Sequence, residues 1–291
     1  MSVSLPMTTY AANWYLEDGS VTVNADNSGQ TVTQGSGSAV PDEAPVITQR
    51  ESSVETGNTI AISTSDNAAA NVTIKDINIK SSNDAIDVKG SSSANITLEG
   101  DNKIFSETGS ALHVSDGNVT INGSGSLKAE IQDEPFGYNH NAKIGSHEKE
   151  DMSGSIHITG DATVKTDGNI APDCGGDGAG IGTGENGEMS GNIVIDGNAQ
   201  VEVSSNDRGA GIGSGDDGNL SGNIMIGGNA QVSATGAEGS AGIGTGDDGN
   251  FTGSITMDGN ARVTAKAGGD HNGSDLSLIH ISEPTRLGMI S

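Results

Sequence analysis

The segment GAGIGSGDDGNLSGNIMIGGNAQVSATGAEG, residues 209–239, decides the fold because it is repeated before and after itself. Four aliphatic registers recur every 31 residues: Ile181, Ile212 and Ile243; Ile193, Ile224 and Ile255; Ile195, Ile226 and Met257; and Val201, Val232 and Val263. An earlier copy, AKIGSHEKEDMSGSI, aligns without gaps to AGIGTGENGEMSGNI. Self-similarity at a fixed period is typical of solenoid proteins, in which each repeat packs only against its neighbours.

A similar repeat with a shorter period lies upstream of these copies. The segments NVTIKDINI, NITLEG and NVTING begin at Asn71, Asn95 and Asn118, which are 24 and then 23 residues apart. Alternating aliphatic residues between Gly, Asn and Asp indicate short strands separated by turns. A strand cannot bury its apolar side alone, so the coils must stack. We therefore predict an all-β, right-handed parallel β-helix of about seven to eight coils, because the hexapeptide period of left-handed helices is absent.

The composition fits a thin, repetitive core. The chain carries a formal charge of −26, with 32% hydrophobic and 2% aromatic residues and 45 glycines. Such a charge repels phosphates and anionic lipids, so we expect neither nucleic acid nor membrane insertion, while cations are attracted. No apolar run reaches the 18 residues of a membrane span. The single cysteine, Cys174, excludes an internal disulfide framework, and we expect a monomer.

Both ends of the chain differ from the repeats. SLPMTTYAANW at the start has the small residues of a secretory cleavage site near Ala11 and Ala12. LSLIHISEPTR, Leu276–Arg286, resembles the in-frame translation of an adaptor used in sequencing libraries. We expect four parts: a signal-peptide remnant (1–12), an N-terminal β cap or irregular segment (13–57), the parallel β-helix (58–275) and an adaptor-derived tail (276–291).

The repeats also carry a resemblance to known proteins. NVTIKDINI, NITLEG and the tandem GAGIGxG and SGxIxIxGNAxV motifs resemble right-handed β-helix regions of secreted or surface proteins of gut Gram-positive bacteria. Those proteins are described as carbohydrate-binding-domain or adhesin-like, and the resemblance covers about residues 58–269. It implies a secreted or cell-surface location and a binding or spacer role. It supplies no catalytic residues.

Acidic residues follow each long GIG motif and are the candidate metal ligands. They are Glu185, Asp216, Asp217, Asp247 and Asp248. Stacked coils lie about 4.8 Å apart, so a column of carboxylates repels itself by roughly 1 kcal/mol per pair even in a water-like dielectric. Calcium, which takes six to eight oxygen ligands, would relieve this repulsion. The alternatives are solvated turns, in which Asp is simply a preferred residue, and a catalytic carboxylate pair.

A non-enzymatic carbohydrate-binding or adhesin-like module for a polysaccharide or glycan is the leading functional hypothesis. Aromatic platforms for sugars are scarce, and the best candidates are Phe136 and Tyr138, with His140, in DEPFGYNHN. The same residues could instead form a hydrophobic plug under a long loop.

Two alternatives to this hypothesis stay open. One is a structural stalk or spacer without a ligand. The other is a pectate-lyase-like enzyme, for which Arg208 would be the base unless it forms a surface ion pair with Asp207. His113 and His157 fall at outward positions of their strands, so we expect them on the surface.

Overall fold

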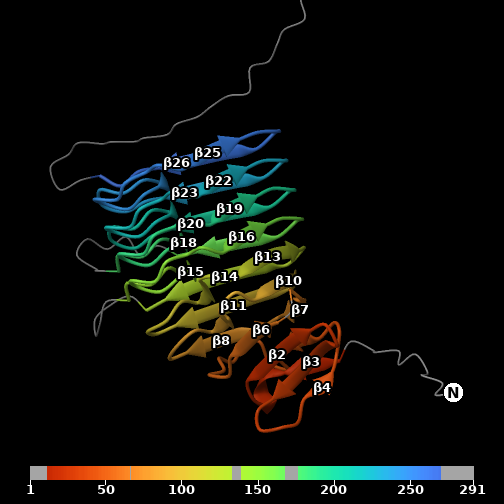
Figure 1. The fold of residues 1–291 in the computed structure, drawn as a ribbon. Helices are drawn as coiled ribbons and strands as arrows, with labels where there is room; N and C mark the ends of the chain where they lie inside the picture. Colours follow the sequence, from red (N-terminus) through yellow and green to blue (C-terminus); the bar gives the residue numbers. More distant parts are fainter. Residues whose placement is uncertain (1–11, 66, 133–138, 168–175, 270–291) are drawn as a thin grey trace, which may run out of the picture.

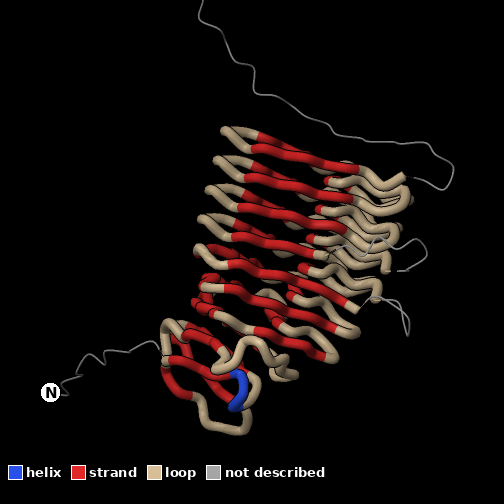
Figure 2. The backbone as a smooth tube through the Cα atoms, turned by 180° about the vertical axis from the view of Figure 1, so that it is seen from behind, coloured by secondary structure: helices blue, strands red, loops and turns tan. Residues whose placement is uncertain are grey.

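The computed structural model describes residues 12–65, 67–132, 139–167 and 176–269, and these residues form a solenoid of stacked strands (Figures 1 and 2). In this described part the only helical segment is one short 3-10 turn, Leu16–Asp18. From β5 onward, strands that follow one another in the chain belong to different sheets, and each strand pairs with its counterpart one coil away. The all-β, parallel, repeat-built architecture predicted from the sequence is therefore confirmed.

Three sheets run the length of the solenoid. Sheet A contains β1 (Asn13–Tyr15), β5 (Val46–Thr48), β7 (Ala69–Lys75), β10 (Ser93–Glu99), β13 (Asn118–Gly123), β16 (Ser155–Ile158), β19 (Asn192–Ile195), β22 (Asn223–Ile226) and β25 (Ser254–Met257). Sheet B contains β6 (Ile60–Thr64), β9 (Ile86–Val88), β12 (Leu112–Val114), β15 (Ile144–Gly145), β18 (Ile181–Gly182), β21 (Ile212–Gly213) and β24 (Ile243–Gly244), and it continues into the N-terminal strands. Sheet C contains β8 (Asn78–Ser81), β11 (Asp101–Ser106), β14 (Ser126–Ile131), β17 (Thr163–Thr166), β20 (Gln200–Ser204), β23 (Gln231–Thr235) and β26 (Arg262–Lys266).

The aliphatic registers seen in the sequence are the registers of strand pairing. Ile193 pairs with Ile224, and Ile224 pairs with Ile255, each one coil further on. Ile193 and Ile224 are fully buried, whereas Met225, which points to the other side of β22, is 43% exposed. Burial of one such side chain contributes about 1.5–3 kcal/mol, so stability accumulates coil by coil along the ladder.

The interior is narrow and is filled by aliphatic side chains. Among the described residues, no Phe, Tyr or Trp side chain is buried in the core. One polar exception is Lys143, which is 1% exposed. Its ammonium group donates hydrogen bonds to the carbonyl oxygens of Asp167 and Ser204, which satisfy the buried charge. The scarcity of aromatic residues follows from this slim cross-section.

An antiparallel hairpin extends sheet B at the N-terminal end of the solenoid (Figure 1). It is formed by β2 (Val21–Asp26) and β3 (Gly29–Gln34), and β4 (Val40–Pro41) pairs with β3. β2 runs parallel to β6 of the next coil. Buried residues Leu16, Val23 and Val32 pack against the core there, so the apolar interior is covered at this end.

Candidate functional site

Glycines in the two-residue strands of sheet B fix the points where the acidic loops begin. Gly213 in β21 has a φ of 139°, a conformation that favours glycine. A Cβ atom at Gly213 would collide with the carbonyl oxygen of Gly244 one coil further on, and one at Gly182 would collide with that of Gly213. Because no other residue permits this approach, the loops start at equivalent places in successive coils.

The loops that follow are joined from coil to coil by main-chain hydrogen bonds. The Asn186 amide donates to the Asp216 carbonyl oxygen at 2.8 Å, and the Asp217 amide donates to that of Asp247 at 2.9 Å. Asn186, Asp217 and Asp248 all have φ values between 52° and 58°, which Asn and Asp tolerate better than most residues. The predicted stacking of the acidic loops is therefore confirmed.

The five predicted calcium ligands do not share one environment. Asp217 and Asp248 are exposed, and Asp247 is half-buried. Asp216 is only 7% exposed, and burial together with the charges of Asp177 and Asp217 raises its pKa to about 7. Arg208 Nη1 lies 3.9 Å from Asp216 Oδ2, so this arginine faces Asp216. Calcium at these carboxylates stays a prediction.

Glu185, the remaining predicted ligand, belongs to a separate group that we name the His140 cluster: His140, Asp177 and Glu185. His140 Nδ1 lies 2.7 Å from Glu185 Oε2 and 2.9 Å from Asp177 Oδ2. The Glu185 amide donates to the His140 carbonyl oxygen at 2.9 Å, which holds the two loops together. The structure therefore unites a predicted ligand-binding residue, His140, with a predicted metal ligand. Phe136 and Tyr138 lie outside the described residues.

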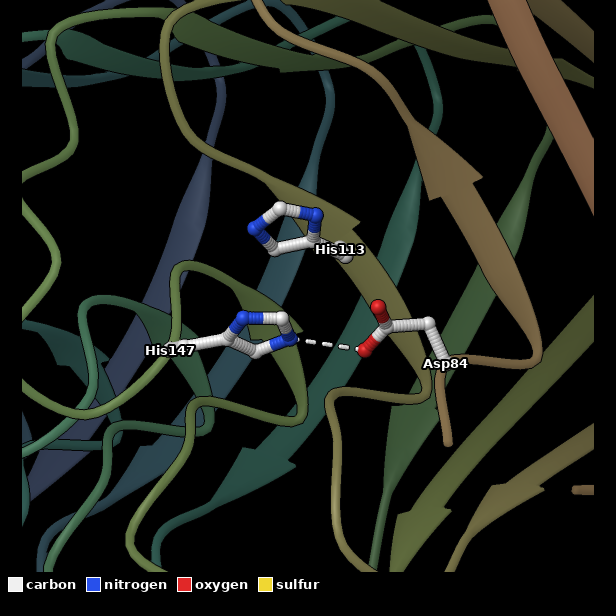
Figure 3. Close-up of side chains that lie close together, drawn as sticks. All are labelled: Asp84, His113 and His147. Atoms are coloured by element: carbon white, nitrogen blue, oxygen red, sulfur yellow. Dashed lines mark hydrogen bonds and ion pairs between the residues drawn. The ribbon is translucent and has the colours of Figure 1, made fainter. Parts of the chain in front are cut away.

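A second group, the stacked-histidine cluster, joins three earlier coils and consists of Asp84, Asp87, His113, His147 and Glu150. The imidazole rings of His113 and His147 lie parallel, with centroids 4.0 Å apart and an interplanar angle of 7° (Figure 3). His147 Nε2 is 2.7 Å from Asp84 Oδ1. His113 lies between Asp87 Oδ1, 3.0 Å from Nδ1, and Glu150 Oε2, 2.8 Å from Nε2.

The two carboxylates keep His113 positively charged. Burial on its own would lower the pKa of His113, but hydrogen bonds with Asp87 and Glu150 outweigh it and raise the pKa to about 10. The hydrogen bond with His113 lowers the pKa of Glu150 to about 2, against the effect of burial. The cluster is thus an imidazolium clamp that ties the loop after β15 to β12 and β9.

This cluster is a feature that sequence reasoning missed. His113 was expected on the surface, and this is wrong, because the residue is 8% exposed beneath the loop that carries His147 and Glu150. His157 is half-buried and pairs with Asp196 at 3.0 Å. The available signal was register: His113 pairs with Asp87 across one coil, so an acid and a base fall on the same row.

The outward side of sheet C offers a different kind of surface, which we name the sheet C face. An open depression of about 280 Å³ is lined there by side chains of four neighbouring strands, including Lys165, Gln200, Glu202, Gln231 and Arg262. A second depression of the same volume lies towards the N-terminus and is lined by residues including Lys80, Lys103, Phe105 and Lys128. Both depressions follow the strand rows of one sheet.

Strand register arranges this face in rows. Gln200 pairs with Gln231, and Gln231 pairs with Arg262. In the neighbouring row Lys103, Lys128 and Lys165 occupy successive coils. Acidic partners balance two of these lysines: Lys128 lies 3.1 Å from Glu130, and Lys165 lies 2.7 Å from Glu202. The face is therefore polar and close to charge balance on a chain whose formal charge is −26.

A larger depression of about 380 Å³ lies at the N-terminal hairpin. It is lined by residues including Asp26, Ser28, Glu43 and Ser65, and belongs to the strands that extend sheet B. It involves one end of the molecule and lacks the repeated rows of the sheet C face.

Comparisons with protein-family models, curated proteins and solved structures give no match to this chain. Within the described residues, no helix has the length and apolar character needed to cross a membrane.

Proposed function

We propose that the chain is a secreted or cell-surface, non-enzymatic β-helix module, right-handed, that binds a polysaccharide along the sheet C face. The observation that carries this proposal is the open depression lined by Lys165, Gln200, Glu202, Gln231 and Arg262. Glutamine amides both donate and accept hydrogen bonds, as sugar hydroxyls do. A repeated row of such groups matches a ligand that is itself a repeating chain.

Charge balance supports a polysaccharide as the ligand of this face. Lys165 and Glu202 pair across one coil while their side chains stay 53% and 66% exposed. Exposed ion pairs of this kind contribute little to stability, typically about 0–1 kcal/mol. Their side chains can therefore exchange this contact for hydrogen bonds to a bound sugar at low cost. The adjacent depression adds Phe105, an aromatic ring on which a sugar can stack.

The test is binding to a panel of immobilised polysaccharides by wild type, by a Gln200→Ala/Gln231→Ala double variant and by an Asn192→Ala/Asn223→Ala control. The control alters an equivalent ladder on sheet A, where Asn223 Nδ2 donates to Asn192 Oδ1 at 3.0 Å. We expect the glutamine variant to lose binding while the control keeps it.

Other outcomes of this panel point elsewhere. Equal loss in both double variants would contradict the assignment to sheet C. Absence of binding to any polysaccharide would favour the alternative of a structural surface stalk.

A polysaccharide lyase is the second candidate function, and one contact favours it. Arg208, the residue that could act as the base, lies beside the acidic loops and 3.9 Å from Asp216. Burial would lower the pKa of Arg208, but the charges of Asp216 and Asp177 outweigh it and raise the pKa above the usual range. A base must lose its proton at the working pH, so this environment opposes that role. Depolymerisation of a uronate-rich polysaccharide, abolished in Arg208→Ala, would reverse this choice.

A further inference from the structure

The His140 cluster brings one imidazole nitrogen and two carboxylate oxygens close enough together to hold a metal ion. One imidazole nitrogen, His140 Nδ1, faces two carboxylate oxygens at once, Asp177 Oδ2 at 2.9 Å and Glu185 Oε2 at 2.7 Å. The three side chains come from three loop segments, before β15, before β18 and after β18. Their side chains are 15–25% exposed, so an ion can reach them from solvent.

Negative charge in this region exceeds the positive charge that faces it. Asp216, in the next coil, is tied to Asp177 by a main-chain hydrogen bond from the Asp216 amide to the Asp177 carbonyl oxygen at 2.9 Å. Asp216 is only 7% exposed. Arg208 is the cation beside it, at 3.9 Å. Burying a carboxylate costs free energy unless an opposite charge pairs with it, so a further cation in this region would stabilise the folded chain.

We propose that His140, Asp177 and Glu185 bind a first-row divalent metal ion of the zinc type. Zinc binds His nitrogen at about 2.0–2.1 Å and carboxylate oxygen at about 2.0–2.2 Å. Neighbouring ligand atoms of a tetrahedral site then lie about 3.4 Å apart. The observed separations of 2.7 and 2.9 Å reach that value by small side-chain rotations.

The imidazole nitrogen distinguishes this site from the acidic loops alone. Calcium is a hard cation that takes oxygen ligands, whereas zinc accepts a mixed set of nitrogen and carboxylate oxygen. The stacked-histidine cluster is a weaker candidate, although Asp84, His113 and His147 also lie close together. Its two rings are parallel and 4.0 Å apart, so their in-plane lone pairs cannot meet at one ion.

The experiment is calorimetric titration of the full chain with ZnCl₂, with melting temperature recorded with and without zinc. The variants are His140→Gln and Glu185→Gln, and the control is His157→Gln, which alters a single histidine–carboxylate pair, His157–Asp196. We expect one zinc ion per chain and a raised melting temperature in wild type and control. Each cluster variant should weaken zinc binding by more than about tenfold, or 1.4 kcal/mol.

Three results would overturn the proposal. One is zinc binding of equal strength in His140→Gln and His157→Gln. Another is loss of zinc binding in His147→Gln but not in His140→Gln, which would place the ion in the stacked-histidine cluster. The third is a melting shift with CaCl₂ and none with ZnCl₂. If His140→Gln does not fold, Glu185→Gln, which keeps nearly the same shape, decides the question alone.

Discussion

Replacement of His113 by Gln should remove a charge-dependent contribution to stability that varies with pH. A pKa of His113 that rises from 6.5 to about 10 corresponds to at most about 5 kcal/mol, at 1.36 kcal/mol per pKa unit. The pKa of the partner residue, Glu150, gives a smaller free energy for the same contact. Its fall from 4.5 to about 2 corresponds to about 3 kcal/mol. Since the Glu150 side chain is 37% exposed and solvent screens it, we expect about 2–3 kcal/mol.

The pH dependence follows from the direction of each change. The folded-state pKa of His113 is raised, so its contribution is complete below about pH 6.5 and is lost as pH rises towards 10. That of Glu150 is lowered, so its contribution is present above about pH 4.5 and is lost as pH falls towards 2. Between about pH 4.5 and pH 6.5 both contributions to stability are complete.

The assay is urea unfolding of wild type and His113→Gln at pH 6 and pH 10, with His157→Gln as the control. The advantage of wild type over His113→Gln should be about 2–3 kcal/mol at pH 6 and below about 1 kcal/mol at pH 10. His157→Gln, whose histidine is half-buried and pairs with one carboxylate, should differ little from wild type at either pH. An advantage that stays constant from pH 6 to pH 10 would refute the imidazolium clamp.

Three further predictions concern the packing of the solenoid. Ile224→Ala removes a buried ladder side chain and should lower the free energy of unfolding in urea by about 2–5 kcal/mol. Met225→Ala, at a 43% exposed position, should change it by no more than about 0.5 kcal/mol. Similar losses in the two variants would contradict the assignment of Ile224 to the interior and Met225 to the surface. Gly213→Ala should prevent folding or lower the melting temperature sharply, because its Cβ meets the Gly244 carbonyl oxygen; an unchanged melting temperature would disprove the close approach. Lys143→Met should destabilise by about 1–3 kcal/mol, because the carbonyl oxygens of Asp167 and Ser204 each lose the hydrogen bond from the ammonium group. A gain in stability would show that burial of the charge costs more than its hydrogen bonds return.

The architecture was predictable because the repeat encodes it directly. Register in a solenoid is sequence spacing, so the 31-residue recurrence of Ile193, Ile224 and Ile255 already states which residues pair. The glycines of the GIG motif were visible too, and their φ values near 140° explain why they recur. The lysine row of the sheet C face could also have been found, since Lys103, Lys128 and Lys165 are one coil apart.

The side-chain clusters were harder to predict because they cross coils of unequal length. Asp84 and His147 are 63 residues apart and meet only after two coils with different loops have been counted. Asp177 lies in the insertion that breaks the repeat period, so spacing gave no position for it. Outward alternation on β12 correctly placed His113 away from the core but could not show that a later loop covers it.

Hydrogen–deuterium exchange with and without a bound polysaccharide tests the proposed function most directly. The ligand would be the best binder in the polysaccharide panel, used at saturation with the full chain. Binding along the sheet C face should slow exchange in peptides that contain β17, β20, β23 and β26, with little change in β16, β19 and β22 of sheet A. Protection confined to sheet A, or to the acidic loops after β18, β21 and β24, would contradict binding along the sheet C face.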